Sequence, residues 1–175
     1  MLDVAVSYNR FKFIGHEFLT WLWFLMEEKR DVLNSLNNKN PISLEIGNGL
    51  TVENMMTDAM EKITIKGDDA GLEEGMMALK KGAVVTELNL ICKTVEFDCQ
   101  FTIKGESLAL SSLKVPETGK VKKPEDLEGT TLERIFFYEK ISELIESLFY
   151  MFLKLRTSQK WKNKTVKEIK DWIKR

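Results

Sequence analysis

A strictly alternating stretch in the middle of the chain constrains the fold more than any other feature. In VEFDCQFTIK, residues 95–104, apolar side chains occupy every second position and polar side chains lie between them. Successive side chains of a β-strand point to opposite faces, so this stretch predicts a strand with one buried and one solvated face. The preceding apolar run, AVVTELNLIC at 83–92, predicts its antiparallel partner.

The turn between these two strands decides which residues face each other. A turn centred on Lys93-Thr94 would place Cys92 opposite Val95, and the apolar residues of both strands would then share one face. In that register Cys99 lies about four residues farther along the ladder than Cys92, roughly 13 Å at the rise of a strand. Because that separation is beyond the reach of a disulfide, we expect both cysteines to be core residues.

Three other stretches predict strands, and one predicts a helix. ISLEIG at 42–47 and KITIKG at 62–67 alternate, while SLALSSLKV at 107–115 slips at Ser111-Ser112, which is typical of a bulge. DDAGLEEGMMALKKG, residues 68–82, begins with two aspartates and ends with two lysines and a glycine. Those are the start and stop signals of a helix.

The N-terminal region predicts a short strand followed by a helix. Residues 1–14 mix apolar and basic positions, and Gly15 breaks their pattern. GHEFLTWLWFLMEEK, 15–29, has only about nine apolar residues in its run where a membrane span needs ~20, so membrane insertion is the weakest reading. A helix that is apolar on nearly every side is usually buried. We therefore expect a core helix over 17–30 rather than an exposed aromatic face that awaits a partner.

The C-terminal third predicts helices after a polar segment. Residues 116–129 hold two of the three prolines and predict a mobile loop, and 131–156 carry an apolar stripe at three- and four-residue steps. A short basic helix ends the chain. Together the elements predict a single α+β domain over 1–175. Its antiparallel sheet of about four to five strands is packed by the buried aromatic helix and the long amphipathic helix.

The composition argues against several function classes. A net charge of −1 gives no long-range field for DNA or anionic lipid, so any nucleic-acid binding depends on local clusters of Lys and Arg. His16 is the single histidine and the two cysteines form no C-x-x-C pair, which leaves little for a zinc site or a Ser-His or Cys-His mechanism. Cysteine usage and the lack of a secretory signal indicate a reducing cytoplasm.

Other catalytic patterns are also missing. The glycines between 67 and 82 match neither a dinucleotide fingerprint nor a P-loop. Asp98 and Lys104 lack the spacing of a metal-dependent nuclease, and alternation explains Asp98 as a solvent-facing strand residue. We therefore expect no enzyme, no cofactor, no metal and no small-molecule substrate.

Positive charge is concentrated in three clusters, at 80–81, at 120–123 and at 154–175. The last cluster holds nine basic residues against Glu168 and Asp171. One interpretation is a solvated helix end; the other is contact with phosphates, which needs no sequence readout. The candidate DNA-binding residues are Lys80, Lys81, Lys120, Lys122, Lys123, Lys154, Arg156, Lys160, Lys162 and Lys164.

The order of these segments resembles the recombination-associated protein RdgC family. The resemblance rests on FLTWLWF, ITIKGDDAGLEEGMMALKKGAVVTELNL, VEFDCQFTIKGESLALSSLKVP and LERIFFYEKISELIESLFYMFLKLRTSQKW, and it covers roughly residues 15–175. It is a pattern of apolar and glycine positions rather than a catalytic signature.

The resemblance implies a non-enzymatic protein that binds duplex DNA without sequence preference. Proteins of that family form a ring-like dimer around DNA and restrain the loading of the recombinase RecA. The expectation is therefore a nucleoid-associated homodimer that modulates recombination or replication. The alternative is a protein-interaction module, of a phage or mobile-element type, that keeps the fold without binding DNA.

Overall fold

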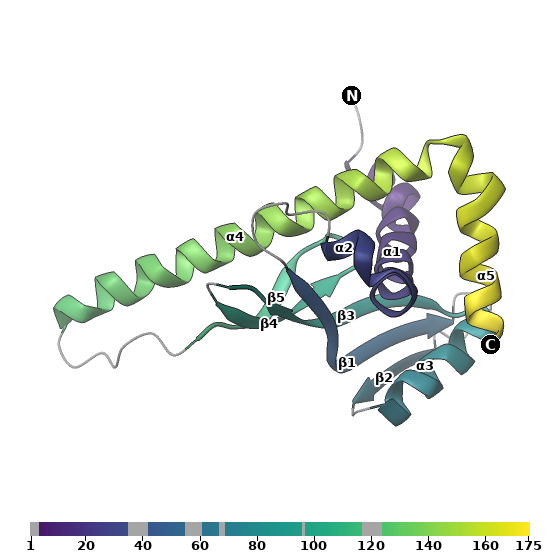
Figure 1. Cartoon of the computed structure of the whole chain (residues 1–175). Helices are drawn as coiled ribbons and strands as arrows, with labels where there is room; N and C mark the ends of the chain where they lie inside the picture. Colours follow the sequence, from purple (N-terminus) through teal and green to yellow (C-terminus); the bar gives the residue numbers. More distant parts are fainter. Residues whose placement is uncertain (1–3, 35–41, 55–60, 67–68, 96, 117–123) are drawn as a thin grey trace.

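The computed structural model describes residues 4–34, 42–54, 61–66, 69–95, 97–116 and 124–175. Five strands form one antiparallel sheet in the order β2-β1-β3-β4-β5, which confirms the predicted α+β class (Figure 1). In chain order the elements are α1 (Val4–Glu28), α2 (Arg30–Asn34), β1 (Ser43–Asn54), β2 (Glu61–Lys66), α3 (Asp69–Lys80), β3 (Val84–Lys93), β4 (Asp98–Lys104), β5 (Leu110–Lys114), α4 (Pro124–Arg156), the π-helix η1 (Trp161–Thr165) and α5 (Val166–Lys174).

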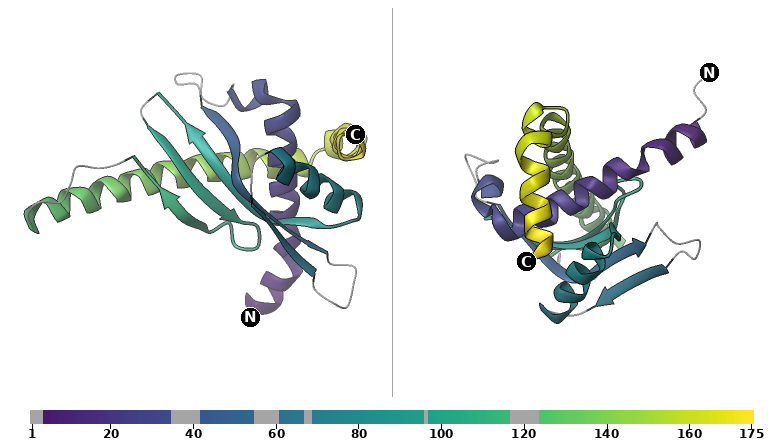
Figure 2. Two further views of the ribbon diagram at one scale, coloured as in Figure 1. Left: turned by 90° about the horizontal axis from the view of Figure 1, so that it is seen from below. Right: turned by 90° about the vertical axis from the view of Figure 1, so that its right-hand side faces the viewer.

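The helices pack on one face of the sheet, and the long helix α4 extends past the strands. Figure 2 shows α1 crossing the sheet, α4 running well beyond its edge, and α5 turning back across the C-terminal end of α1. The core lies between the sheet, α1 and α4, with Phe18, Trp21 and Trp23 almost fully buried. The predicted core helix is therefore confirmed. Burial of these aromatic rings supplies much of the apolar area that folding removes from water.

The predicted N-terminal strand is wrong, because α1 runs without a break from Val4 through Gly15 to Glu28. Gly15 lies against the turn after β4, where a Cβ atom would be 1.7 Å from the carbonyl oxygen of Gly105. The glycine thus permits a close approach of helix and sheet rather than ending a pattern. Sequence periodicity alone could not distinguish these two uses of glycine.

The register of the central hairpin also differs from the prediction. Cys92 lies directly opposite Cys99, four residues from the predicted pairing. The turn spans Thr94–Phe97, where the Thr94 amide donates to the Phe97 carbonyl and the Thr94 hydroxyl also bonds that residue. Val95, predicted to face the core, is 72% exposed in this turn. The threonine side chain closes the turn and keeps Val95 out of the strand, which shortens the ladder.

The paired cysteines are buried free thiols that share a hydrogen bond. That bond, together with burial, raises the pKa of the Cys92 thiol well above its ordinary value. The same bond from Cys92 lowers the pKa of the Cys99 thiol, because it stabilises the ionised form. Their role as core residues is as predicted, but their separation is not.

The remaining boundaries follow the predictions more closely. The predicted bulge is confirmed, since β5 carries one extra residue relative to β4 and Ser112 has a φ of 52°. Helix α3 ends before Gly82, whose φ of 91° is typical of a helix stop. The predicted loop at 116–129 is wrong from Pro124 onward, because α4 begins at Pro124, and proline is a favoured first residue of a helix. Residues 117–123 of that loop lie outside the described residues.

Candidate nucleic-acid interface

Two buried tryptophans hold the C-terminal segment, residues 160–175, against the body of the protein. Trp161 and Trp172 are almost fully buried. The Trp172 ring meets the Trp23 ring edge-on at 5.4 Å, and its indole nitrogen donates to Glu27 at 2.9 Å. These contacts fix α5 on the end of α1. The side chains on the outer side of α5 are therefore presented by a docked helix rather than by a free tail.

A π-helical turn connects the two tryptophans. The Val166 amide donates to the Trp161 carbonyl, five residues back, which widens the helix by one residue at this point. Trp161 and Thr165 both face inward, and the three residues between them are exposed. Two of those three are lysines, Lys162 and Lys164. The turn thus buries its ends and projects positive charge outward.

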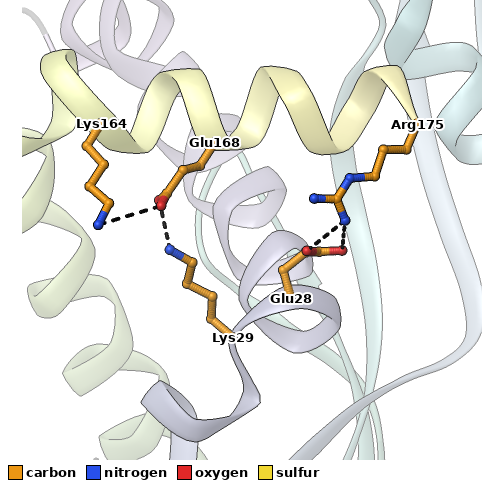
Figure 3. A network of polar contacts seen from close by, with 5 residues as sticks. All are labelled: Glu28, Lys29, Lys164, Glu168 and Arg175. Carbon is orange, nitrogen blue, oxygen red and sulfur yellow. Dashed lines mark hydrogen bonds and ion pairs between the residues drawn. The ribbon is translucent and has the colours of Figure 1, made fainter.

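Ion pairs along the inner edge of α5 join it to the end of α1. Figure 3 shows Glu168 pointing to Lys29, at 2.8 Å, and Arg175 pointing to Glu28, at 3.0 Å. Lys164 of η1 lies 3.9 Å from Glu168 of α5. Both carboxylates and Arg175 are partly exposed, so these pairs orient α5 more than they stabilise the fold.

Several exposed lysines of the segment form no ion pair with any residue that the structure describes. Within the described part of the chain, the exposed lysines of this segment without an ion pair are Lys160, Lys162, Lys167, Lys170 and Lys174. Five such ammonium groups on a fixed segment, with Asp171 as the one exposed carboxylate among them, raise the local positive potential although the whole chain is nearly neutral.

The structure separates the predicted residues of the C-terminal cluster into two kinds. Lys160 and Lys162 are exposed and unpaired, and Lys154 is exposed with its ammonium 5.9 Å from the centre of the Tyr150 ring. Arg156 differs, because it bonds Glu17 at 2.6 Å and lies over the Trp161 ring. We therefore assign Arg156 to the packing of α4 against α1 rather than to a ligand surface.

The other two predicted clusters have different outcomes. Lys80 and Lys81 are exposed at the end of α3, and α3 packs against α5, so this cluster lies on an element next to the C-terminal lysines (Figure 1). Lys120, Lys122 and Lys123 lie outside the described residues. Sequence reasoning did not select Lys167, Lys170 and Lys174 as candidates, although their three- and four-residue steps indicate one helix face.

The uncovered face of the sheet forms a second polar surface that sequence reasoning missed. Gln100 donates to Asn89 at 2.7 Å and to Asn48 at 3.3 Å, and Asn89 donates to Thr102 at 2.9 Å. A bulge in β1 brings Asn48 to this network, and Gly47 lacks the Cβ atom that would lie 2.1 Å from the Asn89 amide oxygen. Alternation in the sequence predicts that Gln100 and Thr102 lie on this face, but no clear pattern in the sequence predicts the bulge in β1.

This network lines a shallow groove of about 400 Å³. Lys66, Lys114 and Glu87 line the groove, and Glu87 pairs with Lys62 at its edge. The groove offers hydrogen-bond donors and acceptors, but only two lysines line it, against one glutamate. It is therefore less suited to a polyanion than the α5 surface.

Known proteins give no independent guide to either surface. No family model matches the chain, and no curated protein or solved structure matches it. Among the described residues, no three histidine, cysteine, aspartate or glutamate side chains gather as a metal ion would require. The helices of the described part include none that is long and apolar enough to cross a membrane.

Proposed function

We propose that this protein binds duplex DNA without sequence preference, through a basic surface made by α5, η1 and the end of α3. The basic surface comprises Lys80, Lys81, Lys160, Lys162, Lys164, Lys167, Lys170 and Lys174. The observation that carries the proposal is that most of these lysines are exposed without an ion pair on a segment docked by two tryptophans.

The chemistry of the surface favours phosphate contact over base readout. A lysine ammonium is a point charge that neutralises phosphates, and the counterions it releases supply binding free energy whatever the sequence. Base recognition relies mainly on arginine, asparagine or glutamine forks aimed into a groove. The basic surface as defined contains lysines alone, so the expected binding is weak, salt-dependent and indifferent to sequence.

The biological setting is a further part of the proposal. The resemblance to the RdgC family suggests a role in recombination or replication control, in the cytoplasm at the nucleoid. In that setting a protein that coats DNA would act by limiting access of other proteins to the duplex. No catalytic group is needed for such a role.

Two triple substitutions of equal charge test which surface is used. Lys160, Lys162 and Lys164 changed together to Gln should weaken duplex binding at low salt at least about tenfold, because three phosphate contacts are lost. The matched control changes Lys66, Lys104 and Lys114 to Gln on the open sheet face and should leave binding within about twofold. If the control variant alone loses binding, the sheet face is the DNA site and the proposed surface is wrong.

One structural observation favours a second function, that of a protein-interaction module. The first half of α4 projects from the body and carries exposed apolar side chains that the sheet does not cover. Loss of DNA binding in every assay together with a stable protein complex would favour this second function.

A further inference from the structure

Residues 127–139 of α4 are exposed on nearly all sides. Figures 1 and 2 show this arm, residues 127–140, extending past the strands. Phe137 meets Phe97 of the hairpin edge-on at 5.0 Å, and from Leu127 to Phe136 no side chain is buried. An isolated helix of this length is only marginally stable in water, so a partner that packs on it would order it further.

The arm nevertheless carries large apolar side chains on the side away from the sheet. Leu132 is 60% exposed, Ile135 48% and Phe136 46%. They lie at three- and four-residue steps, which makes one patch, opposite the stripe that α4 buries through Ile141 and Leu148. A helix that is apolar on two opposite sides normally has both sides covered.

Charges at the two ends of this patch give it a direction. Glu128, Leu132, Phe136 and Lys140 follow one another at four-residue steps and therefore form a single ridge on the helix surface. All four side chains are exposed. The ridge begins with a negative charge, ends with the positive charge of Lys140 and is apolar between them. The Lys140 ammonium also lies 3.0 Å from Glu143 on the surface of the same helix, a pair exposed to solvent and therefore weak.

We infer that this ridge pairs with the same ridge of a second copy of the chain, antiparallel and about a two-fold axis near residue 134. Glu128 of each copy then meets Lys140 of the other, and Leu132 meets Phe136, so each contact occurs twice. A parallel pairing would instead place like charges together at both ends. Ridges at four-residue steps interdigitate when two helices cross at roughly −50°, the commonest class of helix packing.

The area available fits a weak dimer. Covering Leu132, Ile135 and Phe136 would remove on the order of 100 Å² each from water, and the flanking polar side chains add a similar amount. Two copies would then bury roughly 1,000 Å², the lower end of specific interfaces. Gly129 lies beside the ridge with no atom within 4 Å of its Cβ position, so it allows the helices to approach closely. We expect a micromolar dissociation constant.

The inference is tested by exchanging the charges at the ends of the ridge. Dimerisation of the full chain is measured by sedimentation equilibrium at protein concentrations from low to several hundred micromolar. The wild-type protein should dimerise, and Glu128→Lys and Lys140→Glu should each weaken the dimer at least about tenfold. An equimolar mixture of the two variants should form a heterodimer of wild-type affinity, because every charged contact at the ends of the ridge then joins a lysine to a glutamate. Circular dichroism melting checks that both variants fold, and Phe136→Ala provides a change without charge that should also weaken the dimer.

Two outcomes would overturn the inference. One is a wild-type chain that remains monomeric throughout this concentration range, and the other is a pair of charge variants that dimerise separately as well as they do together. A dimer that survives every substitution in the arm uses another surface and also overturns it. Duplex binding in the same preparations reports on the basic surface independently, because none of the lysines of the basic surface lies in the arm.

Discussion

Glu27 on α1 accepts a hydrogen bond from the Trp172 indole of α5 at 2.9 Å, and it also accepts one from the Trp23 indole one turn before it. One carboxylate thereby joins residues 145 positions apart in the chain. The position of the basic surface depends on this contact, because α5 is held by Trp172 and by ion pairs at its edge.

Glu27→Gln should therefore loosen α5 while leaving the sheet intact. A hydrogen bond to a charged group contributes about 1.5–3 kcal/mol, and the exposure of Glu27 places the expected loss near the lower value. Hydrogen exchange of the α5 amides should accelerate more than exchange in β3. The matched control is the neighbouring Glu28→Gln, which removes a more exposed pair with Arg175 and should have a smaller effect.

Gly15 and Gly129 should respond in opposite directions to the same substitution. Gly15→Ala places a methyl group against the Gly105 carbonyl, and the required shift of the backbone should cost about 2–3 kcal/mol. Gly129→Ala adds a methyl group in open space within a helix and should gain about 0.5–1 kcal/mol. Urea unfolding of both variants measures the difference, and a harmless Gly15→Ala would contradict the close packing of α1 on the sheet.

Trp21→Ala should be among the most damaging single changes. The ring is buried between α1 and α4, 5.5 Å from the Phe152 ring, and truncation of such a side chain costs about 3–5 kcal/mol. Tyr150→Ala on the exposed side of α4 is the control, because 67% of that residue is in solvent. A Trp21 variant of normal stability that lost a partner would instead identify this face as an interface.

The observed hairpin register predicts that Cys92 and Cys99 can be linked. Directly opposed residues of antiparallel strands have Cα atoms about 4.5–5.5 Å apart, within the range of disulfides. Oxidation by diamide in mild denaturant, which exposes the two buried thiols, should remove two hydrogens from the chain, as mass spectrometry would show. The oxidised chain should refold to the native circular dichroism spectrum when the denaturant is removed, and Cys92→Ser should remain unchanged in mass. An oxidised chain that cannot refold until the disulfide is reduced would contradict the register.

Regular periodicity explains which parts of the fold could be predicted. The alternation at 95–104 indicated a half-buried strand, and the step pattern of 131–156 indicated a helix with one buried side, because each signal comes from many residues at once. The position of a turn rests on only a few side chains. A single threonine that closes the Thr94–Phe97 turn shifted the cysteine pairing by four residues.

The candidate site was predictable in its composition but not in its arrangement. The density of lysine at the end of the chain was visible in the sequence, whereas the pairing of Arg156 with Glu17 depends on packing between distant helices. The same is true of the exposed arm of α4. Its apolar residues are as regular as those of a core helix, and only the edge of the sheet decides which of them remain in water.

The proposed duplex binding is tested most directly by its dependence on salt. Fluorescence anisotropy of a labelled random-sequence duplex, titrated with protein at several salt concentrations, gives the slope of log K against log salt. Lys167, Lys170 and Lys174 changed together to Gln should reduce the steepness of that slope by up to ~2.7, because each phosphate contact contributes about 0.9. An unlabelled duplex of any sequence should compete equally well. A wild-type protein that shows no binding at the lowest salt, where exposed charges are least screened, would contradict the proposal.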